Sequence, residues 1–83
     1  MPIGEEIINV FNKIRALNEE DRENLFSAPE EYKISLLKDM LALDDRFYVT
    51  IGKSTLSDYG IVFIISLSDQ PSIHFNPSVI RLV

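Results

Sequence analysis

The chain changes character between Asp45 and Arg46, and this change most constrains how it can fold. Before it, apolar residues recur every three or four positions among many acidic side chains, which is the spacing of amphipathic helices. After it, apolar residues alternate with polar ones or run together, as they do in strands. The sequence therefore predicts an α+β fold in a single small domain, residues 1–83, with a helical part over about residues 4–43 and a β part over about residues 46–83.

One or two helices are predicted before residue 28. The first covers about residues 4–17, because its apolar residues are spaced three, four and three apart along one stripe: Ile7, Val10, Ile14 and Leu17. A polar stretch begins at Asn18, and it predicts either a loop or, preferably, a short second helix with Asn18 as its N-cap. Leu25 and Phe26 end this stretch, and we expect them to attach the short helix to the core.

A third helix is expected over about residues 29–43. Ser27-Ala-Pro-Glu30 predicts its start, because Ser three residues before Glu forms a capping box and Pro is tolerated in a first turn. The apolar residues of this helix span an arc of ~200°, whereas a helix on one surface needs only about 100°. They are Tyr32, Ile34, Leu36, Leu37, Met40, Leu41 and Leu43. We therefore expect the helix to contact two surfaces, the sheet and either the first helix or another chain.

The second half predicts a three-stranded antiparallel β-meander. Residues 46–51 alternate cleanly, and residues 61–67 are apolar on both sides, with Val62 and Ile64 opposite the main apolar face. A strand of this kind is covered twice or lies at an interface. The third strand covers residues 73–83 and is an edge or is broken in two, because Asn76-Pro77 interrupts it and proline cannot donate to a ladder.

The charge of the chain disfavours nucleic acid as a partner. The formal net charge is −5, and residues 1–45 hold eleven Asp and Glu against five Lys and Arg. Phosphate backbones bind basic surfaces, so an acidic chain is a poor match. The chain has no cysteine, which excludes disulfides and thiolate metal sites. Its apolar runs are far shorter than the roughly 20 residues of a membrane span, and its N-terminus lacks a signal-peptide pattern, so we expect a cytoplasmic protein with no membrane partner.

No catalytic, cofactor or metal constellation stands out. Gly52-Lys-Ser-Thr55 resembles the end of a P-loop, but Phe47 stands where the pattern requires its first glycine. His74 is the only histidine, and its alternation with Ile73 and Phe75 is typical of a half-exposed strand residue. The acidic residues also lack the ligand spacing of a calcium loop. We therefore expect a protein that is not an enzyme and holds no cofactor or metal.

The surplus of apolar surface predicts a small acidic protein–protein interaction module, such as a subunit, adaptor, inhibitor or immunity-type protein. We expect a hydrophobic contact through Tyr32, Ile34, Leu37 and Leu41, and a polar rim of Glu19, Glu20, Asp21 and Glu23. The rim would face a partner protein with a basic surface, although the same residues also suit solubilising charge. A second copy of the chain is an alternative partner, in a homodimer.

A winged-helix regulator that binds nucleic acid is the alternative function. Three helices followed by a hairpin have the order of that fold, with residues 52–59 as the wing. A DNA-binding third helix would enter the major groove with basic or amide side chains. Here that helix begins with acidic residues and offers only Lys33 and Lys38, so protein contacts are the preferred interpretation.

Overall fold

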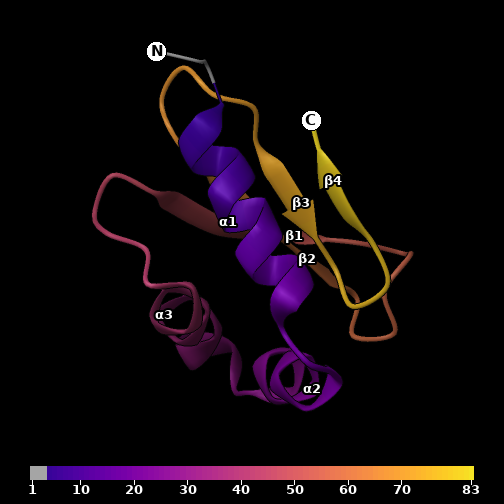
Figure 1. Ribbon diagram of the computed structural model, residues 1–83. Helices are drawn as coiled ribbons and strands as arrows, with labels where there is room; N and C mark the ends of the chain where they lie inside the picture. Colours follow the sequence, from indigo (N-terminus) through magenta and orange to yellow (C-terminus); the bar gives the residue numbers. More distant parts are fainter. Residues whose placement is uncertain (1–3) are drawn as a thin grey trace.

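The computed structural model describes residues 4–83, which form three helices followed by four strands (Figure 1). The elements are α1 Glu5–Ala16, α2 Glu19–Ser27, α3 Glu30–Leu41, β1 Tyr48–Lys53, β2 Ile61–Ser66, β3 Ile73–Phe75 and β4 Ile80–Leu82. The strands form one antiparallel sheet in the order β1-β2-β3-β4. The predicted α+β fold is confirmed, and the predicted number of three strands is wrong.

The fourth strand arises because the predicted last strand is folded into a hairpin. The side-chain oxygen of Asn76 accepts hydrogen bonds from the backbone N–H groups of Ser78 and Val79, both at 2.9 Å. Pro77 lies inside this turn, where its missing N–H removes no ladder hydrogen bond. The chain therefore reverses, and β4 pairs with β3 in the register Phe75 to Ile80.

The first two helices occur where the sequence predicts them, but their caps differ in origin. The side-chain oxygen of Asn18 accepts a hydrogen bond from the N–H of Asp21 at 2.7 Å, so the predicted N-cap of α2 is confirmed. α1 follows Gly4, which has no side chain and a φ of 93°. Gln70, in the β2–β3 loop, supplies the missing acceptor: its Oε1 lies 3.0 Å from the backbone nitrogen of Ile7.

The capping box predicted at Ser27-Ala-Pro-Glu30 does not form. Ser27 is the last residue of α2, and α3 follows Pro29 without a side-chain cap. The connection between the two helices has a different contact. The buried Nζ of Lys33, in α3, donates hydrogen bonds to the backbone oxygens of Phe26 and Ala28 at the end of α2. Lys33 therefore joins α2 and α3 at their connection.

The three helices cover one face of the sheet, and the core lies between them (Figure 1). α1 crosses this face, and α2 and α3 lie at its lower end in the view of Figure 1. The buried core residues come from every helix and from strands β1 to β3 and their flanks: Ile7, Val10, Ile14, Leu25, Phe26, Leu37, Leu41, Phe47, Val49, Phe63, Ile65, Leu67, Ile73 and Phe75. α3 contacts β1, α1 and α2, so neighbours within the chain account for its wide apolar arc.

Phe26 occupies the centre of this core. Its ring centroid lies 5.3 Å from that of Phe63 and 5.3 Å from that of Phe75, in edge-to-face geometry, and 5.7 Å from that of Tyr59. These distances are in the range where aromatic pairs attract each other. The end of α2 is thus attached to the two central strands, as the sequence predicts for Leu25 and Phe26. None of the helices in residues 4–83 is long and apolar enough to cross a membrane.

Candidate functional site

The sheet has an outer face, turned away from the core, on which no helix of residues 4–83 lies. The strand register arranges the residues of this face in three rows that run across the sheet. The rows are Tyr48–Ser66–Ser72–Val83, Thr50–Ile64–His74–Arg81 and Gly52–Val62–Asn76–Val79. We call these twelve positions the outer face. His74 is half-buried there, in agreement with the expectation for a strand residue.

The outer face is unusual in its composition for this chain. An open face of an antiparallel sheet normally carries polar residues, because alternation places the apolar ones in the core. Here Val62 and Ile64 occupy the central strand, and Tyr48, Val79 and Val83 are exposed around them. None of the thirteen Asp and Glu residues stands at any of the twelve positions. The outer face is therefore apolar to weakly basic, whereas the helices carry most of the negative charge.

Gly52 explains how Val62 and Ile64 are accommodated on this face. A Cβ atom at position 52 would lie 3.4 Å from Cγ1 of Val62 and 3.5 Å from Cδ1 of Ile64. The two side chains therefore lean over the backbone of β1, where the glycine leaves space. They remain half-buried rather than buried, so β2 is a central strand that is covered on one face only. The alternative of a strand covered on both faces is wrong for the part of the chain described.

A hollow of about 380 Å³ lies at one end of the outer face. Its apolar lining residues are Leu56, Val62 and Val79, and three basic residues from β1, β3 and β4 also line it: Lys53, His74 and Arg81. Ser54 and Asn76 complete the lining, which contains no carboxylate. The volume is in the range of ligand-binding clefts.

A larger hollow, of about 680 Å³, lies between the start of α3 and the β1–β2 hairpin. Its lining includes the apolar residues Ile51 and Ile61, together with both Glu30 and Lys53. One acidic and one basic side chain give it no preference for a ligand of either charge. The segment after Gly52-Lys-Ser-Thr55 leads into β2 and not into a helix, in agreement with the rejection of a P-loop.

Most other basic side chains that lie near the core have structural partners. Lys13 donates to the carbonyl of Leu41 at 3.1 Å, and Arg22 donates to the carbonyl of Ile14 at 3.1 Å. Both interactions satisfy carbonyl groups at the ends of helices. Within residues 4–83, by contrast, Lys53 and Arg81 make no ion pair with Asp or Glu.

Arg46 is the centre of an exposed ion-pair cluster at the other end of the sheet. Its guanidinium lies 2.8 Å from Glu6 and 3.0 Å from Asp44, and it therefore links α1 to the segment before β1. Hydrogen bonds from the side chain and the backbone of Arg46 lower the pKa of Asp44 below its ordinary value of 3.8. The cluster is an exposed structural contact that holds α1 against the segment before β1.

The apolar group predicted on α3 is divided between the core and the surface. Leu37 and Leu41 are fully buried, with 0% and 1% of their surface exposed, and a side chain in that position cannot touch a partner while the domain is folded. Ile34 is partly buried against the core, whereas Tyr32 is 59% exposed. Of these four predicted residues, only Tyr32 and part of Ile34 remain available for a partner.

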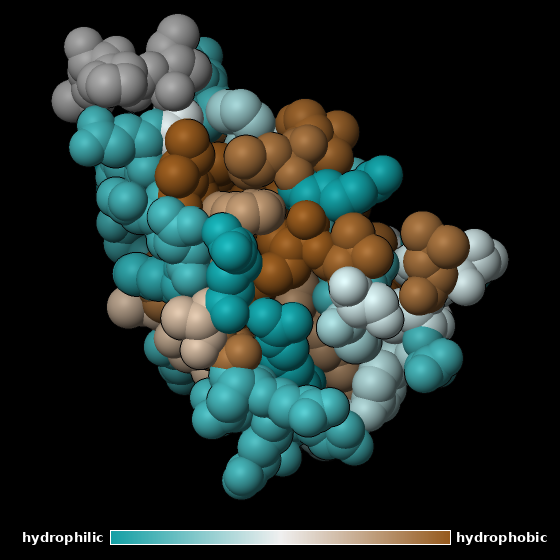
Figure 2. All heavy atoms as spheres, turned by 45° about the vertical axis from the view of Figure 1, so that its right-hand side comes forward, coloured by the Kyte–Doolittle hydropathy of each residue, from teal (hydrophilic) through white to brown (hydrophobic). Residues whose placement is uncertain are grey.

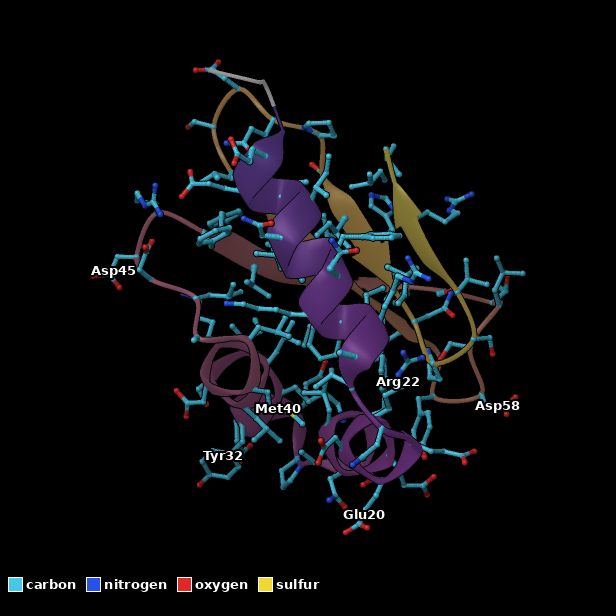
Figure 3. All side chains as sticks on the ribbon, in the orientation of Figure 1. Glu20, Arg22, Tyr32, Met40, Asp45 and Asp58 are labelled. Carbon is cyan, nitrogen blue, oxygen red and sulfur yellow. The ribbon has the colours of Figure 1, made fainter. Side chains whose placement is uncertain are left out.

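The predicted polar rim lies together at one end of the molecule. Glu19, Glu20 and Asp21 form the first turn of α2, and Glu23 follows one turn later. In Figure 3 the side chains of Glu20 and Tyr32 point outward from this same end.

Partial burial raises the pKa of Tyr59 above its ordinary value of 10, and the negative charges of Glu23 and Asp58 act in the same direction.

Hydrophobic and hydrophilic residues at the surface are divided between the strands and the helices. Figure 2, which brings the β4 side of the molecule forward, shows hydrophobic residues gathered over the strands and hydrophilic residues over α1 and α2. The exposed apolar residues of the chain include Leu82 and Val83, at the end of β4 and just after it. The sequence indicated the apolar character of Val62 and Ile64, but it did not indicate that His74, Arg81 and Lys53 would adjoin them.

No protein-family model, curated protein or solved structure compared with the chain matches it significantly. The interpretation of the site therefore rests on its own geometry. Within residues 4–83 no three His, Asp or Glu side chains lie close enough together to hold a metal ion. The side chains that do converge are those of the outer face and its hollow.

Proposed function

We propose that the protein is a small, acidic, non-catalytic protein–protein interaction module that binds its partner through the outer face of the sheet. The observation that carries the proposal is the exposed apolar character of this face, with Val62 and Ile64 at its centre and Tyr48 71% exposed at its margin. Exposed apolar patches of this kind are typical of interaction sites. The mixture of apolar, Tyr and Arg side chains with no carboxylate also matches the composition of interface centres.

The exposed end formed by α2 and α3 is a second candidate surface of the same module. Tyr32 would supply its apolar contact, and Glu19, Glu20, Asp21 and Glu23 its polar rim. Its apolar area is small, because Leu37 and Leu41 are buried, so it is better suited to steering than to tight contact. No observation favours the winged-helix alternative, because Lys33 is buried between α2 and α3.

Site-specific photo-crosslinking in the native host tests the proposal. A photoreactive phenylalanine analogue replaces Tyr48 on the outer face in one variant and Tyr32 on α3 in another, because both positions already hold an exposed aromatic ring. A third variant carries it at the exposed Asn12 on α1 as the control. We expect a defined protein adduct from position 48 and none from position 12.

The other outcomes separate the surfaces. An adduct from position 32 alone would move the interface to the α2–α3 end and would contradict the assignment to the sheet. Equal adduct yields from all three positions, or no adduct from any of them, would contradict the interaction function itself.

A further inference from the structure

We propose that the outer face recognises a segment of a different protein that carries carboxylate side chains beside apolar ones, and that these carboxylates bind at the hollow lined by Lys53, His74 and Arg81. This inference rests on the proposed function and adds the chemistry of the partner.

The charged residues that line the hollow are all basic. Lys53 ends β1, while His74 and Arg81 are directly opposite each other on β3 and β4. All three line one hollow that contains no Asp or Glu, in a chain whose net charge is −5. A site of this composition attracts negative charge, and within residues 4–83 it has no ion pair of its own that would compete.

Apolar side chains line the hollow beside these cations. Leu56, which is 73% exposed, Val62 and Val79 adjoin the basic groups in the same hollow. An isolated anion would leave these side chains in water. An extended segment whose every second residue is in turn apolar and acidic would use both features, because these side chains share one face: the apolar ones could cover Val62 and Val79 while the carboxylates meet the cations.

A second copy of the chain fits this face poorly. A two-fold dimer through the outer face would bring Lys53, His74 and Arg81 of both copies together, with no carboxylate on the face to neutralise them. The acidic turn of α2 in a second copy offers little apolar surface beside its carboxylates, because Leu25 and Phe26 are buried in its own core and Tyr32 is the exposed apolar side chain at that end.

Nucleic acid is disfavoured for a related reason. The formal net charge of the chain is −5, with eleven of its thirteen carboxylates within residues 1–45, and this charge repels a long polyanion. Tyr48 is also the one exposed tyrosine, phenylalanine or tryptophan among the twelve positions of the outer face, so stacking of successive bases has little support.

A titration followed by NMR of the 15N-labelled full chain tests the proposal. The probe is a blocked heptapeptide in which leucine and glutamate take turns at every second position with serine between them, so that both lie on one face of an extended chain. The matched probe has glutamine in place of each glutamate. At low ionic strength we expect the glutamate peptide to shift the amide resonances of Val62, His74 and Arg81. We expect it to bind roughly three- to tenfold more tightly than the glutamine peptide, with a difference that shrinks as salt is added.

Charge-reversal variants localise the effect. Arg81→Glu is expected to abolish the preference for the glutamate peptide, whereas Lys38→Glu makes the same charge change on α3 and is expected to preserve it. The amide spectrum of each variant also reports whether it is folded. Loss of the preference in both variants would contradict the assignment to the hollow.

The remaining outcomes distinguish this inference from the proposed function. Equal binding of both peptides at the outer face would overturn the acidic partner and leave an apolar interaction face intact. Binding of neither peptide would overturn the inference alone, because the crosslinking experiment judges the function independently. Shifts produced by an oligothymidylate but not by the peptide, or by raising the protein concentration alone, would also overturn it, in favour of nucleic acid or of a second copy.

Discussion

Replacement of Phe26 by leucine should destabilise the domain far more than its modest change in size implies. The ring of Phe26 lies 5.3 Å, 5.3 Å and 5.7 Å from those of Phe63, Phe75 and Tyr59, respectively. Aromatic pairs in such geometry contribute about 0.5–1.5 kcal/mol each beyond the area they bury. Leucine keeps an apolar side chain but removes all three pairs, and the smaller side chain leaves part of a fully buried site unfilled. We expect the free energy of unfolding to fall by about 2–4 kcal/mol.

That loss is large for a chain of this length. Domains have a free energy of unfolding of about 0.05–0.15 kcal/mol per residue, which corresponds to about 4–12 kcal/mol here. One kcal/mol shifts the Tm of a small domain by about 4–8 °C, so Phe26→Leu should lower it by about 8–32 °C. Urea denaturation followed by circular dichroism measures the free energy, and a thermal scan measures the Tm.

Phe47→Leu is the matched control. Phe47 is also buried, but no other aromatic ring in residues 4–83 pairs with it, so leucine should cost only about 1 kcal/mol there. A double-mutant cycle of Phe26→Leu with Phe75→Leu should give a coupling energy of about 0.5–1.5 kcal/mol. Equal losses at positions 26 and 47, together with a coupling near zero, would refute the reasoning from the ring pairs.

Three further predictions concern turns and titrating groups. Ala42→Gly should raise the free energy of unfolding by about 1 kcal/mol, because Ala42 is the C-cap of α3 with a φ of 53° and glycine adopts this conformation without strain. A free energy of unfolding below that of the wild type in urea denaturation would contradict this. Asn76→Ala should lower it by about 1–2 kcal/mol, because two backbone N–H groups lose their acceptor, and Asn76→Asp should restore most of the loss. The pKa of Asp44 is lowered in the folded state, so its contribution to stability is fully present above the unfolded pKa and is lost as pH falls through the folded pKa. The difference in free energy of unfolding between wild type and Asp44→Asn should therefore shrink toward pH 2 in urea denaturation series. A difference that stays constant with pH would refute this.

Much of the local structure could be predicted because its causes lie close together in sequence. The cap at Asn18 is made by a residue three positions from its donor, and the alternation of residues 47–51 is visible within six positions. The capping box at Ser27 does not form because Ser27 is the last residue of α2 and therefore is not the N-cap of α3. Lys33 satisfies the carbonyl groups at the end of α2 from within α3, and no local pattern indicates this contact. The fourth strand was missed because the side chain of Asn76 closes a turn around Pro77 where the pattern indicated only an interruption.

The candidate site could be predicted only in part. The alternation of residues 61–67 already indicated that Val62 and Ile64 are apolar residues on the face opposite the core-facing one. Their neighbours could not be inferred, because the positions of His74 and Arg81 beside them depend on the pairing of three strands in one register. Helix periodicity likewise does not tell which part of an apolar arc lies in the core, and Leu37 and Leu41 were therefore expected at an interface.

The hydrogen bond between Ile7 and Gln70 has a consequence for how the chain acquires its structure during synthesis. α1 is the first of the described elements to leave the ribosome, but the side chain that completes its first turn is added 63 residues later. A helix of 12 residues is marginal by itself in water, as helices shorter than about 12–15 residues generally are. The nascent N-terminal segment is therefore expected to remain loosely ordered until the loop that carries Gln70 emerges, so that the helices and the sheet become ordered together in one late step.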